Sequence, residues 1–194
     1  MSADMQNILI VGVGGQGTIL ASRALAAVVL RAGFEVKVSE IHGMAQRGGS
    51  VVTQARWGER VFSPIIPPGE AGIILAFEKL EALRWLPWLR RGGQMLVSDQ
   101  RIDPMPVVTG AAAYPEDAIA QMRAAGAAVT VCDGLALARQ AGNAKAVNIV
   151  LLGLLSRCLE FAPAEWEAAL RAVTPPRFLD VNLEAFRLGR SSTA

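Results

Sequence analysis

Residues 12–17 have the spacing of a phosphate-binding loop. Their sequence, GVGGQG, matches the pattern G-x-G-x-x-G. In that pattern Gly12 permits a tight turn, Gly14 lets the backbone approach a phosphate, and Gly17 allows close packing of a helix on a strand. A helix beginning here would add free N–H groups and a partial positive charge. The motif therefore indicates a nucleotide or phosphate site, although glycines in this pattern can also form only a sharp strand-to-helix turn.

Glu40 lies about 20 residues beyond the glycine motif, where dinucleotide-binding proteins place the acid that holds a ribose hydroxyl. The alternative is a solvated residue at the end of a strand. Gly15 beside Gly14, and Gln16 in place of a hydrophobic residue, depart from the commonest dinucleotide pattern. These departures weaken the prediction of NAD more than the prediction of a phosphate.

The segment EIHGMAQRGGS, residues 40–50, is the second candidate site and contains the only histidine of the chain. Neither a nucleophile nor an orienting carboxylate is assured near His42, so a structural role is favoured and no catalytic residue is predicted. Arg47 has a planar guanidinium that suits a phosphate or carboxylate, or an acid of a partner chain. The candidate binding residues of both loops are Gly12, Gly14, Gly15, Gln16, Gly17, Glu40, His42, Gly43, Gln46, Arg47, Gly48 and Gly49.

Alternating strands and helices would position these loops. The predicted strands are residues 7–11, 34–39, 50–56, 73–77, 94–98 and 127–132, with a possible edge strand in residues 102–109. The predicted helices are residues 17–32, a segment from about residue 79, and residues 115–125, 134–141, 144–160, 163–173 and 180–188, with Asn143 as an N-cap. This order predicts a single α/β domain, residues 1–194, with a Rossmann-like, doubly wound, mostly parallel sheet and a helical C-terminal third.

The carboxyl ends of parallel strands meet at one edge of a sheet, where doubly wound proteins bind ligands. Both glycine-rich loops should therefore face the same crevice. Glu78 and residues 98–100 would join this rim if their strands are parallel to the first.

Composition excludes several classes of protein. The net charge of +2 gives no reason to expect a nucleic-acid partner. Cys132 and Cys158 lie too far apart in sequence, and are too few, to predict a disulfide framework, a CxxC zinc site or a four-cysteine cluster, so no metal site is expected. Residues 146–155 form the longest apolar stretch, too short for a membrane helix of about 20 residues. Asp4 stands where a signal peptide would be basic, and a cytoplasmic location is expected.

Four segments carry a resemblance to a known family. These are GVGGQG at residues 12–17, EIHGMAQRGGSV at 40–51, AFEKLEALRWLP at 76–87 and GNAKAVNIVLLGLL at 142–155. In this order they resemble the gamma-type domain of 2-oxoacid:ferredoxin oxidoreductases, over residues 8–189. Gly72 departs from the family pattern, which usually has an aspartate there.

The resemblance implies a non-catalytic small subunit. A large (alpha) subunit would carry thiamine diphosphate, Mg and [4Fe-4S] clusters, and the complex would oxidatively decarboxylate an aryl 2-oxoacid of the indolepyruvate type to the acyl-CoA, passing electrons to ferredoxin. None of these cofactors would be held by this chain alone. CoA could contact residues 14–17 and Arg47. Residues 132–134, CDG, resemble the start of a thiamine motif, but the first glycine is replaced and no Asn-Asn pair follows.

Two other functions stay open from the residues alone. One is a stand-alone NAD- or FAD-dependent dehydrogenase built on the glycine motif and Glu40. The other is an assembly module whose glycine loop binds no small molecule.

Overall fold

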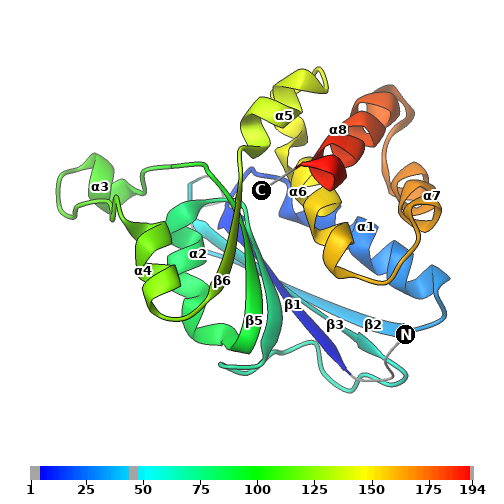
Figure 1. The fold of residues 1–194 in the computed structure, drawn as a ribbon, viewed down its shortest axis with the longest axis horizontal. Coiled ribbons are helices and arrows are strands. Elements are labelled where there is room, and N and C mark those ends of the chain that lie inside the picture. The colour runs from blue at the N-terminus through cyan, green and yellow to red at the C-terminus, as the bar shows by residue number, and fades with distance from the viewer. Residues whose placement is uncertain (1–4, 44–47, 193–194) are drawn as a thin grey trace.

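The computed structural model describes residues 5–43 and 48–192 and contains one six-stranded sheet (Figure 1). The strands are β1 (Gln6–Val13), β2 (Glu35–His42), β3 (Ser50–Gly58), β4 (Ala71–Ala76), β5 (Leu89–Ser98) and β6 (Ala128–Cys132). They lie in the order β2-β3-β1-β4-β5-β6. Strand β3 is antiparallel to β1 and β2, whereas β1, β4, β5 and β6 pair in parallel. The predicted mostly parallel α/β fold is confirmed.

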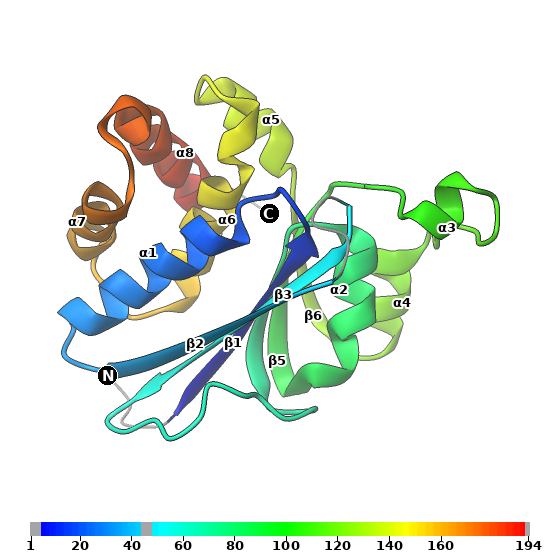
Figure 2. The ribbon, with the colours of Figure 1, turned by 180° about the vertical axis from the view of Figure 1, so that it is seen from behind.

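Helices cover both faces of the sheet, as Figures 1 and 2 show. They are α1 (Thr18–Arg31), α2 (Lys79–Trp85), α3 (Met105–Val108), α4 (Ala118–Ala124), α5 (Gly134–Gln140), α6 (Val147–Leu155), α7 (Pro163–Val173) and α8 (Leu179–Ser191). Helices α1, α6, α7 and α8 lie on one face, and α2 and α4 lie on the other. The C-terminal third is helical, as the sequence predicted.

The central strand β1 is buried on both faces. Ile8 and Ile10 pack in the larger core cluster, whereas Leu9 and Val11 pack in the smaller one beneath α2. This burial on two sides explains why β1 is a continuous apolar run instead of an alternating one.

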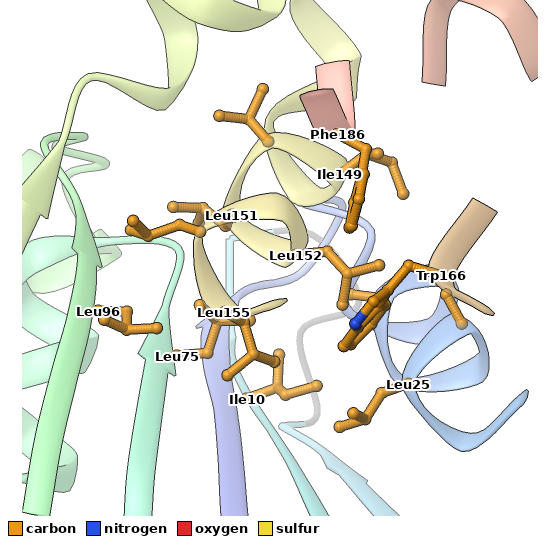
Figure 3. Close-up of a cluster of buried hydrophobic side chains, with 14 of the residues drawn as sticks. Ile10, Leu25, Leu75, Leu96, Ile149, Leu151, Leu152, Leu155, Trp166 and Phe186 are labelled. Atoms are coloured by element: carbon orange, nitrogen blue, oxygen red, sulfur yellow. The ribbon is translucent and has the colours of Figure 1, made fainter. Parts of the chain in front are cut away.

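Helix α6 lies at the centre of the larger cluster, and all its residues are buried. Figure 3 shows Leu155 directed toward Ile10 and Leu75 on the sheet, while Leu152 faces Trp166 of α7. The apolar residues of α6 therefore form part of the hydrophobic core. Within residues 5–43 and 48–192, no helix combines the length and the hydropathy needed to cross a membrane.

Helices α6 and α8 touch backbone to backbone at two glycines. A Cβ atom on Gly189 would lie 1.9 Å from the Val150 carbonyl oxygen, and one on Gly153 would lie 2.2 Å from the Phe186 carbonyl oxygen. No side chain fits between these helices at the crossing. The two glycines thus allow α8 to pack closely on α6 and to cover the outer side of the core.

Two sequence predictions differ from the structure for reasons that involve Pro and Gly. Residues 102–109, predicted as a possible edge strand, contain α3 instead. Pro104 and Pro106 fit the start of a helix, where a missing N–H costs nothing. Strand β5 begins at Leu89, before the predicted start at residue 94, and runs through Gly92 and Gly93, where the register of β4 and β5 shifts between Ala71 and Ile73. The glycines mark an irregularity within the strand.

Candidate functional site

The glycine loop joins β1 to α1 at the carboxyl edge of the sheet. Gly17 is the N-cap of α1 and has a φ of 82°, in the left-handed region. A Cβ atom there would lie 2.5 Å from Asn148 Nδ2, which donates a hydrogen bond to the Gly17 carbonyl at 3.0 Å. At Gly12 a Cβ atom would lie 2.8 Å from Gln16 Oε1. Backbone conformation and close packing on α6 thus require glycine at the last position of the motif.

The Gln16 side chain connects the glycine loop to the ends of two other strands by hydrogen bonds. Its Oε1 accepts a hydrogen bond from the Val13 N–H at 2.7 Å. Its Nε2 donates to the Phe77 carbonyl at 2.9 Å and to Gln100 Oε1 at 3.1 Å. Phe77 follows β4 and Gln100 follows β5, so one amide joins the ends of three strands. Gln16 is therefore a positioning residue, which explains its departure from the usual dinucleotide pattern.

Only part of the loop backbone is available to a ligand. The Gly14 N–H donates to the Gly49 carbonyl at 2.8 Å, and the Gln16 N–H donates to the Val13 carbonyl at 3.1 Å. Among the described residues, no acceptor is found for the N–H groups of Gly15 and Gly17. Gly15 has a φ of 99°, and a Cβ atom there would meet nothing within 4 Å. The loop thus presents two donors, beside the N-terminus of α1.

A cleft of about 420 Å³ opens at this point. Its lining residues are Gly15, Gln16, Gly17, Gln100, Ala144, Lys145 and Val147. Lys145 is exposed and forms no ion pair with the residues that the structure describes. An unpaired ammonium group and the positive end of α1 both favour an anion here.

A second cleft, of about 350 Å³, shares Lys145 with the first. Its other lining residues are Leu20, Asn143, Ala146, Asn148, Pro175, Phe178 and Asn182. Asn143 is the N-cap predicted from the sequence, since its Oδ1 accepts a hydrogen bond from the Lys145 N–H at 2.9 Å. The Phe178 ring in this cleft lies 4.7 Å from the Arg177 guanidinium, and Asn182 Nδ2 donates to Thr174 Oγ1 at 3.4 Å. Sequence reasoning missed Lys145 as a site residue, although its place just before α6 was a usable signal.

The second glycine-rich loop lies beside the first, as predicted. The hydrogen bond from Gly14 to Gly49 joins the two loops, and Gly43 donates its N–H to the Ser50 carbonyl at 3.1 Å. Gly48 has a φ of 76°. The predicted site residues Gln46 and Arg47 lie outside the described residues.

Glu40 and His42 belong to β2 and not to the loop. The Glu40 carboxylate contacts His42 Nε2 and accepts a hydrogen bond from Thr53 Oγ1 at 3.4 Å. Because β3 lies between β1 and β2, Glu40 is two strands, or about 10 Å, from β1. Its register partner Thr53 is opposite Ile10, below the glycine loop. This placement does not support a ribose contact by Glu40.

Glu78, expected at the rim, is buried and occupied by structural bonds. Its carboxylate caps α2 by accepting from the Glu81 N–H at 2.9 Å, and it also accepts from Tyr114 Oη at 2.5 Å and the Ile102 N–H at 3.2 Å. Burial, followed by the bond to Glu78, raises the pKa of Tyr114 well above its usual range. Glu81 accepts a hydrogen bond from Ser50 Oγ, and burial raises the pKa of the Glu81 carboxyl. These acids therefore hold the rim together, and neither of them lines the cleft at the glycine loop.

The described residues do not fit thiamine diphosphate or an iron–sulfur cluster. Cys132 is buried and Cys158 is exposed, and no group of three His, Cys, Asp or Glu residues in the described part could hold a metal ion. Asp133 caps α5 through a bond from the Ala136 N–H at 2.9 Å. The donors at the first cleft, the N–H groups of Gly15 and Gly17 and the ammonium group of Lys145, suit an anionic ligand.

Comparisons with known proteins agree over nearly the whole chain. Residues 7–192 match the family model described as pyruvate ferredoxin/flavodoxin oxidoreductase. Over 190 residues, 94% of this chain and 93% of the relative, the sequence is 40% identical to the indolepyruvate oxidoreductase subunit IorB of Thermococcus kodakarensis.

Two solved structures share the fold. The gamma subunit of a keto/oxoacid ferredoxin oxidoreductase from Geobacter sulfurreducens has a TM-score of 0.70 and 22% identity, with 95% of each chain covered. A 2-oxoglutarate:ferredoxin oxidoreductase from Magnetococcus marinus, with 2-oxoglutarate, coenzyme A and succinyl-CoA bound, has a TM-score of 0.71 and 21% identity. The match covers 96% of this chain but 30% of that one, so the same fold forms one part of a longer polypeptide there.

Proposed function

Because the chain belongs to the pyruvate ferredoxin/flavodoxin oxidoreductase family, we propose that it is the small subunit of an indolepyruvate oxidoreductase complex. The observation that carries this proposal is the 40% identity to an IorB subunit over nearly the full length of both chains. The complex would oxidatively decarboxylate an aryl 2-oxoacid to its acyl-CoA and pass the electrons to ferredoxin. Residues 1–194 would act as one gamma-type module, in the cytoplasm.

The proposed complex divides the chemistry between two chains. A large subunit would hold thiamine diphosphate, Mg and the [4Fe-4S] clusters, which supply the decarboxylation and electron transfer. One observation supports this division: the related fold makes up 30% of a longer oxidoreductase chain, so this chain corresponds to one part of such an enzyme. A stand-alone NAD or FAD dehydrogenase is not favoured, since Glu40 lies far from the glycine loop.

The small subunit would contribute a binding surface for CoA. CoA carries a pyrophosphate and a 3′-phosphate, which suit the N–H groups of Gly15 and Gly17 and the ammonium group of Lys145. In the adjoining cleft, the face of the Phe178 ring that Arg177 does not cover and the amide oxygen of Asn182 would meet an adenine base. On the second loop, Gly43, Gly48 and Gly49 would border this surface. Gln46 and Arg47 lie outside the described residues and stay predictions from the sequence. Bound in this way, CoA would be oriented toward the large subunit without proton transfer by this chain.

CoA kinetics of the assembled complex test the binding proposal. We expect Lys145→Ala to raise the KM for CoA about tenfold, the effect of one charge-assisted hydrogen bond, with little change in dye reduction by the 2-oxoacid before CoA is added. The matched control is Arg139→Ala, an exposed residue of α5 outside both clefts. An unchanged KM would count against CoA contact at this site. Dye reduction by the isolated small chain would refute its role as a non-catalytic subunit.

A further inference from the structure

Residues 99–117 form an arm that leaves the body of the molecule. The arm begins after Ser98 at the end of β5 and returns at α4, in the helical layer that also contains α2. Figures 1 and 2 show α3 at its far end, away from both helical layers. A projecting segment of this kind contributes few residues to the hydrophobic core, so stability of the subunit alone does not explain it.

The tip of the arm is exposed and uncharged. Residues 104–115, PMPVVTGAAAYP, contain no Asp, Glu, Lys or Arg, in a chain with 19% charged residues. Met105 is 68% exposed and Val108 is 64% exposed. These two side chains are three positions apart on α3 and therefore lie on one side of it. Single exposed apolar residues are common, but a pair on a charge-free projection is typical of a contact surface.

The base of the arm is rigidly built. Arg101 bonds to Asp103 on the outgoing side at 2.6 Å and to Glu116 on the returning side at 2.5 Å. Its guanidinium lies 4.3 Å from the centre of the Tyr114 ring. The Tyr114 hydroxyl is anchored in turn by the buried Glu78 carboxylate. The tip is thus held out in a defined position, which lowers the entropy lost when it binds.

We propose that Met105 and Val108 insert into an apolar socket on the large subunit of the complex. This inference rests on the proposed function. Gln100, at the start of the arm, lines the cleft at the glycine loop and bonds to Gln16 of that loop. A partner seated on the arm therefore stands next to the cleft where CoA would meet the large subunit's cofactors.

A second copy of this chain is a poorer occupant for the tip. Stable specific interfaces bury about 1,200–2,000 Å² in total, and two four-residue helices meeting tip to tip fall far short of this area. A larger subunit can surround the arm and bury both side chains completely. Residues that are fully buried near the centre of an interface contribute most of its affinity.

Assembly of the two purified full-length subunits tests the proposal. The double variant Met105→Ala/Val108→Ala should bind the large subunit at least about tenfold more weakly than the wild type, measured by titration calorimetry or surface plasmon resonance. The control is Leu30→Ala, which removes an apolar side chain that is 59% exposed on α1, away from the arm. Circular dichroism and thermal unfolding should be unchanged in all variants, because these side chains lie in solvent.

Each outcome decides between the two proposals. A tenfold loss of affinity for the large subunit that is confined to the arm variant supports the proposed insertion of Met105 and Val108. If the wild type assembles and the arm variant binds equally well, or if Leu30→Ala costs as much, the inference about the arm is wrong while the proposed function stands. If the wild type shows no affinity for the large subunit, the proposed function fails, and the arm proposal fails with it. If sedimentation shows a dimer of the isolated chain that the arm substitutions dissociate, the occupant is a second copy and the proposal is overturned.

Discussion

Replacing Gly17 by alanine tests how tightly the glycine loop is packed on α6. Both Gly15 and Gly17 have positive φ values, 99° and 82°, so an alanine at either position is strained by about 1–2 kcal/mol. Only at Gly17 does the new Cβ atom meet a neighbour, since it would lie 2.5 Å from Asn148 Nδ2. Gly15→Ala is therefore a control that carries the strain without the collision.

The collision adds two costs at Gly17. Asn148 must move, which costs about 1–3 kcal/mol in a packed region, and its hydrogen bond to the Gly17 carbonyl, worth about 1 kcal/mol, is lost. We expect Gly17→Ala to lower the free energy of unfolding by about 2–4 kcal/mol more than Gly15→Ala. For a domain of this size, the additional fall in melting temperature would be about 4–16 °C.

Urea and thermal unfolding followed by circular dichroism would measure this difference. Equal losses in the two variants, within about 0.5 kcal/mol, would refute the reasoning, because they would show that Asn148 is not confined against the loop. Adding Asn148→Ala to Gly17→Ala should recover part of the loss, since the smaller side chain makes room for the new methyl group.

Two further predictions concern Glu81 and the crossing of α6 with α8. Burial raises the pKa of Glu81 above 4.5, so its contribution to stability is complete below pH 4.5 and is lost as the pH rises through the raised pKa. Glu81→Gln can still accept the bond from Ser50 but cannot titrate, so it should flatten the fall in stability with rising pH. Urea unfolding between pH 4.5 and 8 would measure the free energy of unfolding of both proteins. An unaltered pH profile in the variant would show that Glu81 is not responsible. Gly189→Ala should cost about 3 kcal/mol or more or prevent folding, because its Cβ atom would lie 1.9 Å from the Val150 carbonyl oxygen, whereas Gly92→Ala, with nothing within 4 Å, should cost only about 1–2 kcal/mol. Comparable stability of these two glycine variants would contradict the close helix crossing.

Local patterns predicted most of the elements and the meeting of the two loops. The apolar run of β1, the glycine motif and the helical spacing of α7 each depend on residues close together in sequence, and all three agree with the structure. The general rule that ligands and loops gather at the carboxyl edge of a parallel sheet predicted that the two loops meet, and the bond from Gly14 to Gly49 agrees with it.

The sequence was less informative about the direction of the strands and the position of side chains. An alternating pattern looks the same in both directions, so the sequence did not show that β3 runs antiparallel between β1 and β2. That insertion separates Glu40 from the glycine loop. Lys145 was missed as a site residue because it reaches the cleft only through the packing of α6 on the start of α1, and the occupied N–H of Gly14 depends on a residue in a distant loop.

The central position of β1 also bears on how the chain folds during synthesis. Although β1 is the first strand to be made, its neighbours are β3 and β4, and β4 ends at Ala76. Roughly sixty more residues must be added after Val13 before both neighbours exist, which takes several seconds at about 5–20 residues per second. During this time β1, which is buried on both faces in the folded chain, has no complete sheet to join. The β2–β3 hairpin is complete before β4 is made, and β3 offers β1 its first partner. The position of β3 between β1 and β2, which moves Glu40 away from the glycine loop, therefore also shortens the time during which β1 is unpaired.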